Sequence, residues 1–205
     1  MIEIKNVTKI IKNNTVLENI NLKINDGEMM LLRGHNGCGK TMLLRLIAGF
    51  IKPTVGEVKK NESSEIGVII ENPSFFLEET AFYNLKYLAD IRKKITDEEI
   101  LSSMKQLGLF EYRNNKVKTF SLGMKQRLAL CQAFMENPDI ILLDEPFNAI
   151  DDENVKKVVN ILNKLKSKGK IIVIASHGDI KECSFDKVIK MSNGKIVEEK
   201  IKTKK

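Results

Sequence analysis

The chain has 205 residues, enough for one large domain or one domain with a subdomain around a buried core. Its net charge of +7, from 34 Lys and Arg against 27 Asp and Glu, is modest, and no basic stripe is interleaved with aromatic residues, so nucleic acid is not an expected partner. Three scattered cysteines without metal-ligand spacing, no signal peptide and only short apolar runs favour a reduced, cytosolic chain that reaches a membrane through a partner.

The first 33 residues alternate apolar and polar side chains, a pattern typical of β-structure. Strands are expected over residues 2–7 and 15–24, with a turn at residues 25–28 because of its Asn, Asp and Gly content. An apolar run then predicts a buried strand that ends at Arg33. The sequence therefore predicts an antiparallel β layer before residue 34.

Residues 34–41, GHNGCGKT, fit the phosphate-binding pattern G-x-x-x-x-G-K-[ST] between this strand and a helix predicted over residues 42–48. The glycines let backbone N–H groups face a triphosphate without Cβ clashes, and a helix starting near Gly39 adds its positive end. Lys40 is expected to neutralise the β- and γ-phosphates, and the Thr41 hydroxyl to bind Mg²⁺. The expected nucleotide-binding residues of this segment are Gly34, His35, Asn36, Gly37, Cys38, Gly39, Lys40, Thr41 and Met42.

Residues 53–57 are expected to form a loop, and residues 66–70 a short buried strand followed by Glu71. A carboxylate just past the end of a strand, in an α/β protein with a phosphate loop, lies where ligands bind. Glu71 is therefore a candidate site residue.

From residue 80 the sequence pattern becomes typical of helices. Residues 81–93 carry apolar side chains at helical spacing, and residues 96–99 form a capping box that opens a second helix, which Gly108 is expected to end. We expect a mostly helical subdomain over about residues 75–138, inserted into the α/β core.

Ser121 is a suitable N-cap for a helix expected through about residue 135, and capping alone is the default role for a Ser there. The alternative is a second helix N-terminus that grips phosphate. Residues 140–143 predict a buried strand that ends in Asp144 and Glu145. Burying a carboxylate costs free energy unless it binds a metal or serves in catalysis. Asp144 is therefore expected to hold Mg²⁺, and Glu145 to polarise the attacking water as a general base.

A polar turn is expected at residues 148–152, then an amphipathic helix over residues 152–168 and a buried parallel strand over residues 170–175. Ser176 and His177 follow this strand. A lone histidine is usually structural, but at the carboxyl end of a strand beside a nucleotide site His177 is better explained as a γ-phosphate sensor.

Three other features have plainer interpretations. Residues 188–191 and 195–198 predict a closing hairpin. The basic tail, residues 200–205, is expected to be a solvated end, with weak attraction to anionic lipid as the alternative. For Cys38, a small residue that fits the loop is favoured over a thiol whose alkylation blocks nucleotide binding.

The order of phosphate loop, Glu71 loop, Ser-x-Gly helix, Asp144-Glu145 pair, Asp151 loop and His177 loop resembles the ATP-binding subunit of ABC transporters over essentially the whole chain. The resemblance implies a single ABC ATPase domain over residues 1–205. Its fold would be that of a P-loop NTPase, with a RecA-like α/β core, an N-terminal antiparallel β subdomain and an inserted helical signature subdomain. It also implies a homodimer that sandwiches two ATP molecules with Mg²⁺.

The resemblance assigns roles to individual residues. Glu145 is similar to the catalytic base and His177 to the switch histidine, while Asp151 matches the acid of the D-loop. Ser121 and Gly123 match the signature motif, which touches the γ-phosphate bound to the other subunit. The implied Mg²⁺ ligands are Thr41, Glu71 and Asp144.

Three positions depart from the family pattern. Residues 120–124 read Phe-Ser-Leu-Gly-Met, so that Leu122 replaces a glycine, Glu71 replaces the usual glutamine, and Ile11 stands where an adenine-stacking aromatic residue is usual. The first two departures resemble the branch linked to bacitracin resistance and lantibiotic immunity.

This branch implies a motor subunit at the cytoplasmic face of the cell membrane that exports a drug or antimicrobial peptide through separate integral-membrane permease subunits. The alternatives are a soluble ABC ATPase without a transport role, the ATPase of an importer, or a nucleotide-binding module without turnover. Intact Lys40, Asp144, Glu145 and His177 argue against the last of these.

Overall fold

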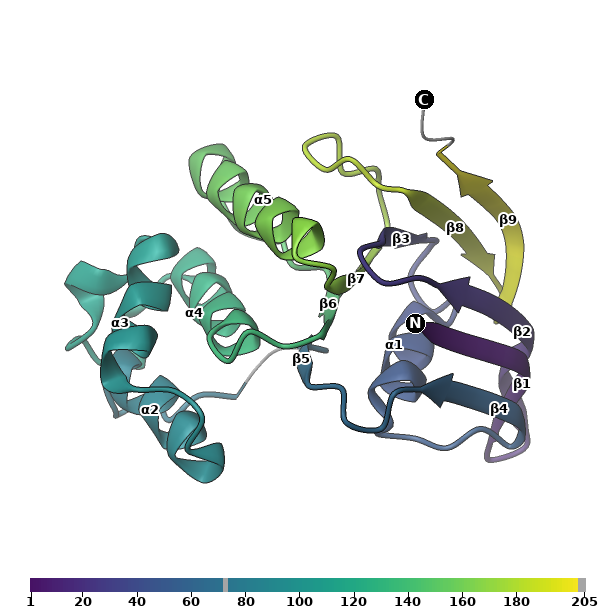
Figure 1. Cartoon of the computed structure of the whole chain (residues 1–205), viewed down its shortest axis with the longest axis horizontal. Helices are drawn as coiled ribbons and strands as arrows, with labels where there is room; N and C mark the ends of the chain where they lie inside the picture. Colours follow the sequence, from purple (N-terminus) through teal and green to yellow (C-terminus); the bar gives the residue numbers. More distant parts are fainter. Residues whose placement is uncertain (72–73, 203–205) are drawn as a thin grey trace.

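The computed structural model of the chain describes residues 1–71 and 74–202, in two β-sheets and their covering helices (Figure 1). The smaller sheet is antiparallel, in the order β2-β1-β4. Its strands are β1 (Ile2–Ile11), β2 (Asn14–Ile24) and β4 (Val55–Lys60). The predicted antiparallel layer is confirmed, and β1 runs four residues further than expected, to residue 11 rather than residue 7.

The prediction of a loop over residues 53–57 is wrong from Val55 onward, because these residues begin β4. The segment lacks an alternating apolar pattern because it is an edge strand with mostly exposed side chains, so only backbone pairing to β1 defines it. Gly56 adopts a φ of 83°, and a Cβ there would come within 2.4 Å of the Lys5 and Asn6 carbonyl oxygens.

The larger sheet has six strands in the order β5-β6-β7-β3-β8-β9. Five of them, β5, β6, β7, β3 and β8, run parallel to one another. Strand β9 closes the sheet as an antiparallel hairpin with β8, as predicted. The bounds of the strands are β3 Met29–Arg33, β5 Ile66–Ile69, β6 Ile140–Asp144, β7 Ile171–Ser176, β8 Lys187–Ser192 and β9 Lys195–Ile201.

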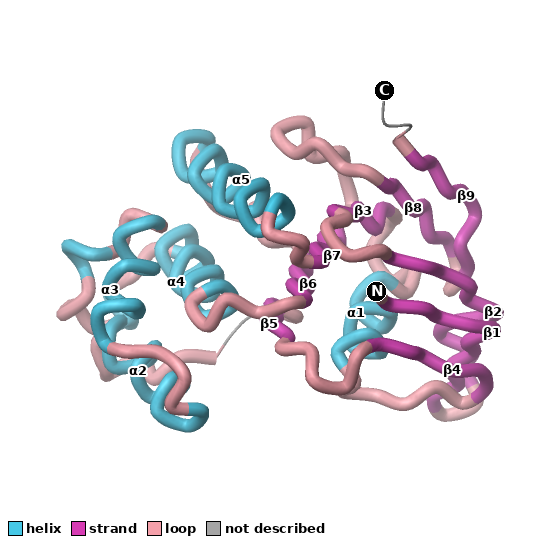
Figure 2. The backbone as a smooth tube through the Cα atoms, in the orientation of Figure 1, coloured by secondary structure: helices cyan, strands magenta, loops and turns pink. Residues whose placement is uncertain are grey.

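Helix α1 (Lys40–Ala48) lies with the antiparallel sheet on one side of the larger sheet, and the other helices lie on its opposite side (Figures 1 and 2). The bounds of the latter are α2 Ala81–Arg92, α3 Asp97–Gln106, η1 Phe110–Tyr112, η2 Val117–Thr119, α4 Leu122–Phe134 and α5 Asp152–Ser167. Within residues 1–71 and 74–202, no helix combines the length and the apolar character needed to cross a bilayer.

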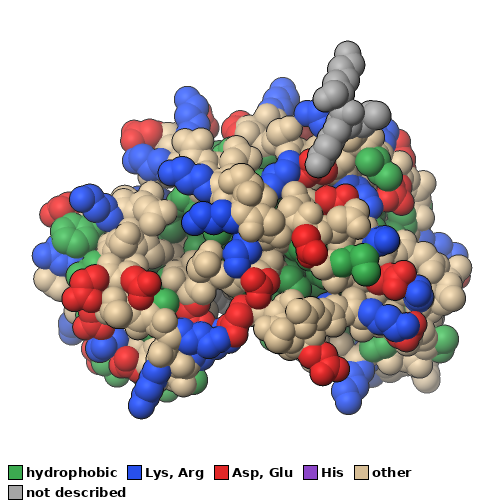
Figure 3. Space-filling model, in the orientation of Figure 1, with side chains coloured by type: hydrophobic (Ala, Val, Ile, Leu, Met, Phe, Trp, Pro, Cys, Tyr) green, Lys and Arg blue, Asp and Glu red, His purple; other side chains and the backbone are tan. Residues whose placement is uncertain are grey.

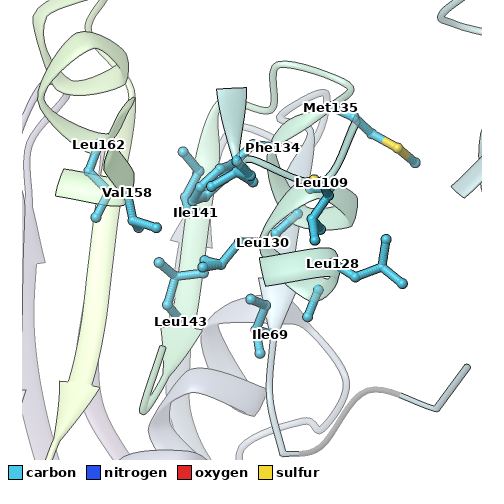
Figure 4. Close-up of a cluster of buried hydrophobic side chains, with 14 of the residues drawn as sticks. Ile69, Leu109, Leu128, Leu130, Phe134, Met135, Ile141, Leu143, Val158 and Leu162 are labelled. Carbon is cyan, nitrogen blue, oxygen red and sulfur yellow. The ribbon is translucent and has the colours of Figure 1, made fainter. Parts of the chain in front are cut away.

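The central strands separate two hydrophobic cores because successive side chains on a strand point to opposite faces. In β6, Ile141 and Leu143 pack against the helices α4 and α5 (Figure 4). Ile140 and Leu142 belong to the core formed with α1 and the antiparallel sheet. A sheet covered on both faces explains why β6 and β7 are apolar at nearly every position.

The predicted helix ends are present. The Thr96 side chain and Glu99 form the reciprocal capping box of α3, and Ser121 accepts a hydrogen bond from the Met124 N–H at the start of α4. Asp151 caps α5 in the same way, through the Asn154 N–H. These caps set where α4 and α5 begin, next to the loops that follow β6.

Candidate active site

A cavity of about 790 Å³ opens at the carboxyl ends of β3 and β6, a volume in the range that holds a small ligand. Its size and place match the nucleotide site expected from the phosphate loop. On the face of the molecule shown in Figure 3, acidic and basic side chains are intermixed. The cavity is lined by Thr15, Val16, Asn36, Gly37, Gly39, Lys40, Thr41, Met42, Glu71, Gln126, Asp144, Glu145, Asn148, Asn193 and Gly194.

The phosphate loop connects β3 to α1. Gly37 and Gly39 adopt φ angles of 80° and 109°, which side chains rarely tolerate. Lys40 is buried, with 6% of its surface exposed, and its Nζ donates to the backbone oxygens of Gly34 at 2.7 Å and His35 at 3.2 Å. The Lys40 ammonium group therefore lies against the backbone of the loop that is expected to bind phosphate.

Three residues of the loop do not line the cavity. The Cys38 side chain is 1% exposed and belongs to the core between α1 and the antiparallel sheet. A Cβ on Gly34 would lie 2.5 Å from the Cys38 Sγ and from the Met191 oxygen, so glycine is required there by packing. His35 is exposed, and its Nδ1 lies 2.9 Å from the Asn36 oxygen.

Asp144 ends β6 and accepts a hydrogen bond of 2.5 Å from the Thr41 hydroxyl. Only β7 separates β6 from β3, so the carboxyl ends of these strands bring the two side chains together. Burial raises the pKa of the Asp144 carboxyl, the Thr41 hydrogen bond opposes this, and the nearby negative charges of Glu145 and Glu71 add to it. A cation at this carboxylate would offset its desolvation.

Glu145 follows at once, with its backbone at a φ of 48° and its N–H bonded to the Ala175 oxygen at 2.9 Å. Its Oε1 accepts a hydrogen bond from the His177 N–H at 2.8 Å and lies 2.9 Å from the His177 Nδ1. The arrangement joins the predicted base to the predicted sensor, with a proton on Nδ1 donating to the carboxylate.

Glu71 lines the cavity from the loop after β5, and its Oε1 accepts a 2.6 Å hydrogen bond from the Arg45 Nη2. Its backbone has a φ of 64°, unusual for a residue other than glycine. Asn72 and Pro73, which complete the motif noted in the sequence, lie outside the described residues.

Ser121, Gly123 and Asp151 do not line the cavity of their own chain. Ser121 is exposed at the start of α4, while a Cβ on Gly123 would come within 2.4 Å of the Ala149 oxygen. Asp151 is exposed, and hydrogen bonds from the Asn154 side chain and N–H lower the pKa of its carboxyl. His177 also lies outside the lining and, with Glu145, borders a neighbouring cavity of about 290 Å³.

Six lining residues were not predicted. They come from β2, α4, the loop after Glu145 and the β8–β9 turn: Thr15, Val16, Gln126, Asn148, Asn193 and Gly194. The Asn193-Gly194 pair was visible in the sequence only as a turn; a bond from the Gly194 N–H to the Cys38 oxygen brings it to the phosphate loop. Ile11, expected near an adenine, is not among the lining residues.

Comparison with known proteins agrees with this geometry. The family model described as ABC transporter matches residues 17–148. An uncharacterized ABC transporter ATP-binding protein of Bacillus subtilis, YybJ, is 44% identical, over 96% of this chain and 94% of its own. The lantibiotic transport ATP-binding protein SrtF of Streptococcus pyogenes is 32% identical over 86% and 80%, and the bacitracin transport ATP-binding protein BcrA of Enterococcus faecalis 34% over 97% and 68%.

Among solved structures, the dimeric post-hydrolysis state of the ATP-binding cassette MJ0796 bound to ADP and Pi superposes with a TM-score of 0.87. The two chains are 28% identical, and the match covers 98% of each. The predicted P-loop NTPase fold with its antiparallel β subdomain is thus confirmed. The chain belongs to the ABC transporter family and is one of its ATP-hydrolysing, ATP-binding subunits.

Proposed function

We propose that this subunit drives export: ATP binding closes a homodimer, hydrolysis reopens it, and separate permease subunits alternate access in response. In this proposal the chain is a single ABC ATPase domain whose residues 75–138 form the helical subdomain. The observation that carries the chemistry is that Thr41, Asp144 and Glu145 line one cavity, with the Thr41 hydroxyl bonded to Asp144. His177 borders the neighbouring cavity and is bonded to Glu145.

Phosphate binding and the metal come first. Lys40 is placed to exchange its bonds with backbone oxygens for bonds to a phosphate, while the N–H groups of the glycine loop bind further phosphate oxygens. The oxygens of Thr41, Asp144 and Glu71 suit Mg²⁺, a hard cation. Over the described part of the chain, no three acidic, histidine or cysteine side chains lie close enough together to hold a metal ion by themselves. The oxygens of Thr41, Asp144 and Glu71 therefore fit Mg²⁺ that arrives with a nucleotide and keeps phosphate and water ligands.

Glu145 is assigned as the general base for the attacking water. One oxygen is held by His177, which fixes the carboxylate and leaves Oε2 for a water. Because Nδ1 of His177 faces Glu145, Nε2 remains to sense the γ-phosphate.

A second copy would complete the site. We assign Ser121 and Gly123, at the exposed N-terminus of α4, to the γ-phosphate bound by the other subunit, and Asp151 to the interface between the copies. The dimer formed by the similar ATP-binding cassette MJ0796 supports the pairing of two copies that this proposal requires.

The permease contact is assigned to an aromatic cluster formed by Phe76, Tyr83 and Tyr87. Their side chains are 51%, 45% and 46% exposed, and their ring centroids lie 5.1 to 6.4 Å apart. Leu77 and Ile91 add exposed apolar surface at 48% and 67%. A patch of this kind favours a protein partner, and a permease would hold the subunit at the cytoplasmic face of the membrane.

The cargo class is the least direct part of the proposal. It rests on the Glu71 and Leu122 departures and on the printed functions of SrtF and BcrA, which are lantibiotic and bacitracin transport. A drug or antimicrobial peptide is therefore the proposed class of cargo.

The test is a pull-down of the tagged subunit from detergent-solubilised membranes of its own source, with ATPase activity assayed on the complex. A polytopic partner without an extracellular binding protein supports export, whereas such a binding protein favours import. Recovery of ribosomes or DNA would rule out transport and leave the ATPase chemistry intact. Replacing Tyr87 by Ser should release the permease but keep ATP binding, while Tyr112→Ser, at a similarly exposed tyrosine, should keep both.

A further inference from the structure

The cavity holds an excess of negative side chains at its metal end. Glu71, Asp144 and Glu145 all line it, whereas Lys40 is the lining cation. A triphosphate adds several further negative charges, and Mg²⁺ and Lys40 offset part of them. The glutamine usual at position 71 in this family is neutral, so Glu71 brings one additional negative charge close to where the γ-phosphate would lie.

Arg45 supplies the opposite charge from α1. It stands four residues after Thr41, so the two side chains project from the same face of the helix, one turn apart. The Arg45 Nη2 lies 2.6 Å from Oε1 of Glu71, and the side chains of the pair are 32% and 63% exposed. The ion pair therefore links the Glu71 carboxylate to α1, the helix that also carries Lys40 and Thr41.

The contact engages one carboxylate oxygen only. Arg45 bonds to Oε1, which leaves Oε2 of Glu71 for a metal-bound water or the metal itself. The backbone of Glu71 is held at a φ of 64°, a conformation that a side chain of this type adopts at a cost and that is often retained for function.

We propose that Arg45 is a positioning residue for Glu71. It reduces the electrostatic repulsion between Glu71 and bound Mg²⁺-ATP by offsetting the charge of the carboxylate and fixing its orientation. This inference rests on the proposed nucleotide site and goes beyond it, because it gives a role to a residue outside the phosphate-binding motifs. Exposed ion pairs contribute little in water, but a bound nucleotide displaces that water and weakens the screening between Glu71 and the phosphates.

The test measures binding of a fluorescent, non-hydrolysable ATP analogue in the presence of Mg²⁺, at low and high salt. Arg45→Gln should weaken binding about 5-fold at low salt, below the range typical for removal of a residue that supports a metal ligand because the pair is partly exposed. The loss should shrink at high salt because mobile ions screen the uncompensated carboxylate. Lys59→Gln, which breaks an exposed ion pair with Glu57 within β4, serves as the control and should bind as the wild type does.

The decisive variant is the double substitution Arg45→Gln and Glu71→Gln. It should regain most of the affinity lost in Arg45→Gln, because removing the carboxylate removes the repulsion. A double variant that binds no better than Arg45→Gln would mean that Arg45 acts independently of Glu71. An Arg45→Gln variant that matches the Lys59→Gln control would also overturn the inference, whereas failure of the wild type to bind would overturn the proposed nucleotide site itself.

Discussion

Glu145 is held through its backbone and its carboxylate at once. The backbone has a φ of 48°, which costs about 1 kcal/mol or more for a residue with a side chain, and the N–H bond to the Ala175 oxygen secures it. The carboxylate is tied to His177 through Oε1. Such restraint reduces the reorganisation needed to direct one oxygen at a water, which suits the proposed role as base.

Glu145→Gln should trap an ATP-bound dimer. The amide oxygen can still accept the bond from the His177 N–H, so the loop keeps its shape and binds nucleotide, but turnover should fall about 10²- to 10⁴-fold without a base. ATPase assays and size-exclusion chromatography with Mg²⁺-ATP measure the two effects.

The matched control is Glu111→Gln, which neutralises an exposed carboxylate in η1 and should behave as wild type. If Glu145→Gln stays monomeric with Mg²⁺-ATP while the wild type dimerises, the assignment of the base is wrong.

At the scale of elements, the N-terminus of α4 fits closely against the loop that follows Glu145, the proposed base. A Cβ on Gly123 would lie 2.4 Å from the Ala149 oxygen, which is a backbone atom that a side-chain rotation cannot move aside. The family resemblance explains Gly123 by contact with nucleotide in the other subunit. The fold adds a second reason, which is the approach of α4 to its own chain.

Gly123→Ala should therefore destabilise the isolated chain, by about 1 to 3 kcal/mol, as expected for overpacking. Urea unfolding without nucleotide measures this separately from any effect on the dimer. Gly178→Ala is the matched control, because a Cβ there meets nothing within 4 Å and its backbone is not in the left-handed region. Equal stability of the two variants would mean that the start of α4 adjusts freely.

The sequence predicted the elements that carry their own pattern. β6 and β7 are continuous apolar runs, α3 has its capping box, and the phosphate loop has its glycines. β4 was missed because an exposed edge strand needs no apolar alternation, and its position depends on pairing with β1.

The same division holds for the site. Lys40, Thr41, Asp144, Glu145 and His177 belong to local motifs, and the structure brings them together. Other contributions depend on contacts between distant segments, which no local pattern encodes. Examples are the Arg45–Glu71 pair, 26 residues apart, and the Asn193-Gly194 turn against the phosphate loop.

For the molecule as a whole, ion pairs join the helical part to the larger sheet. Glu65, just before β5, pairs with Arg92 and Lys94 at the end of α2, and Arg92 also contacts Glu136 at 2.7 Å. The Lys94 hydrogen bond, with Arg92 nearby, holds the pKa of Glu65 below its ordinary 4.5. The direction is opposite to that at Asp144 in the cavity, because the ionised form of Glu65 is stabilised by its cationic partners.

The junction should make the fold acid-sensitive. A carboxyl whose pKa is lower in the folded chain stabilises the fold above its unfolded pKa, and this contribution is lost as the pH falls through the folded pKa. The unfolding free energy should therefore decline from about pH 5 to pH 3. Asp144 acts with the opposite sign, because its pKa is raised by burial.

Glu65→Gln should flatten part of this decline, since the titrating group is removed. Glu62→Gln, which changes an exposed carboxylate three residues earlier, should leave it unchanged. Urea unfolding monitored by circular dichroism across the pH range measures both, and an identical decline in the two variants would exclude Glu65 as a source of the acid sensitivity.

The Gln126 side chain connects the helical part to the backbone at Glu145, the proposed base. The Gln126 Nε2, on α4, donates to the backbone oxygen of Pro146 at 3.2 Å and lies 3.5 Å from the backbone oxygen of Glu145. Coupling free energy between two binding sites is reciprocal. If nucleotide binding changes the affinity of α4 for a partner, binding of that partner changes the nucleotide affinity by the same factor. A partner that holds α4 in one position should therefore change nucleotide affinity through the Gln126 amide and the backbone beside Glu145.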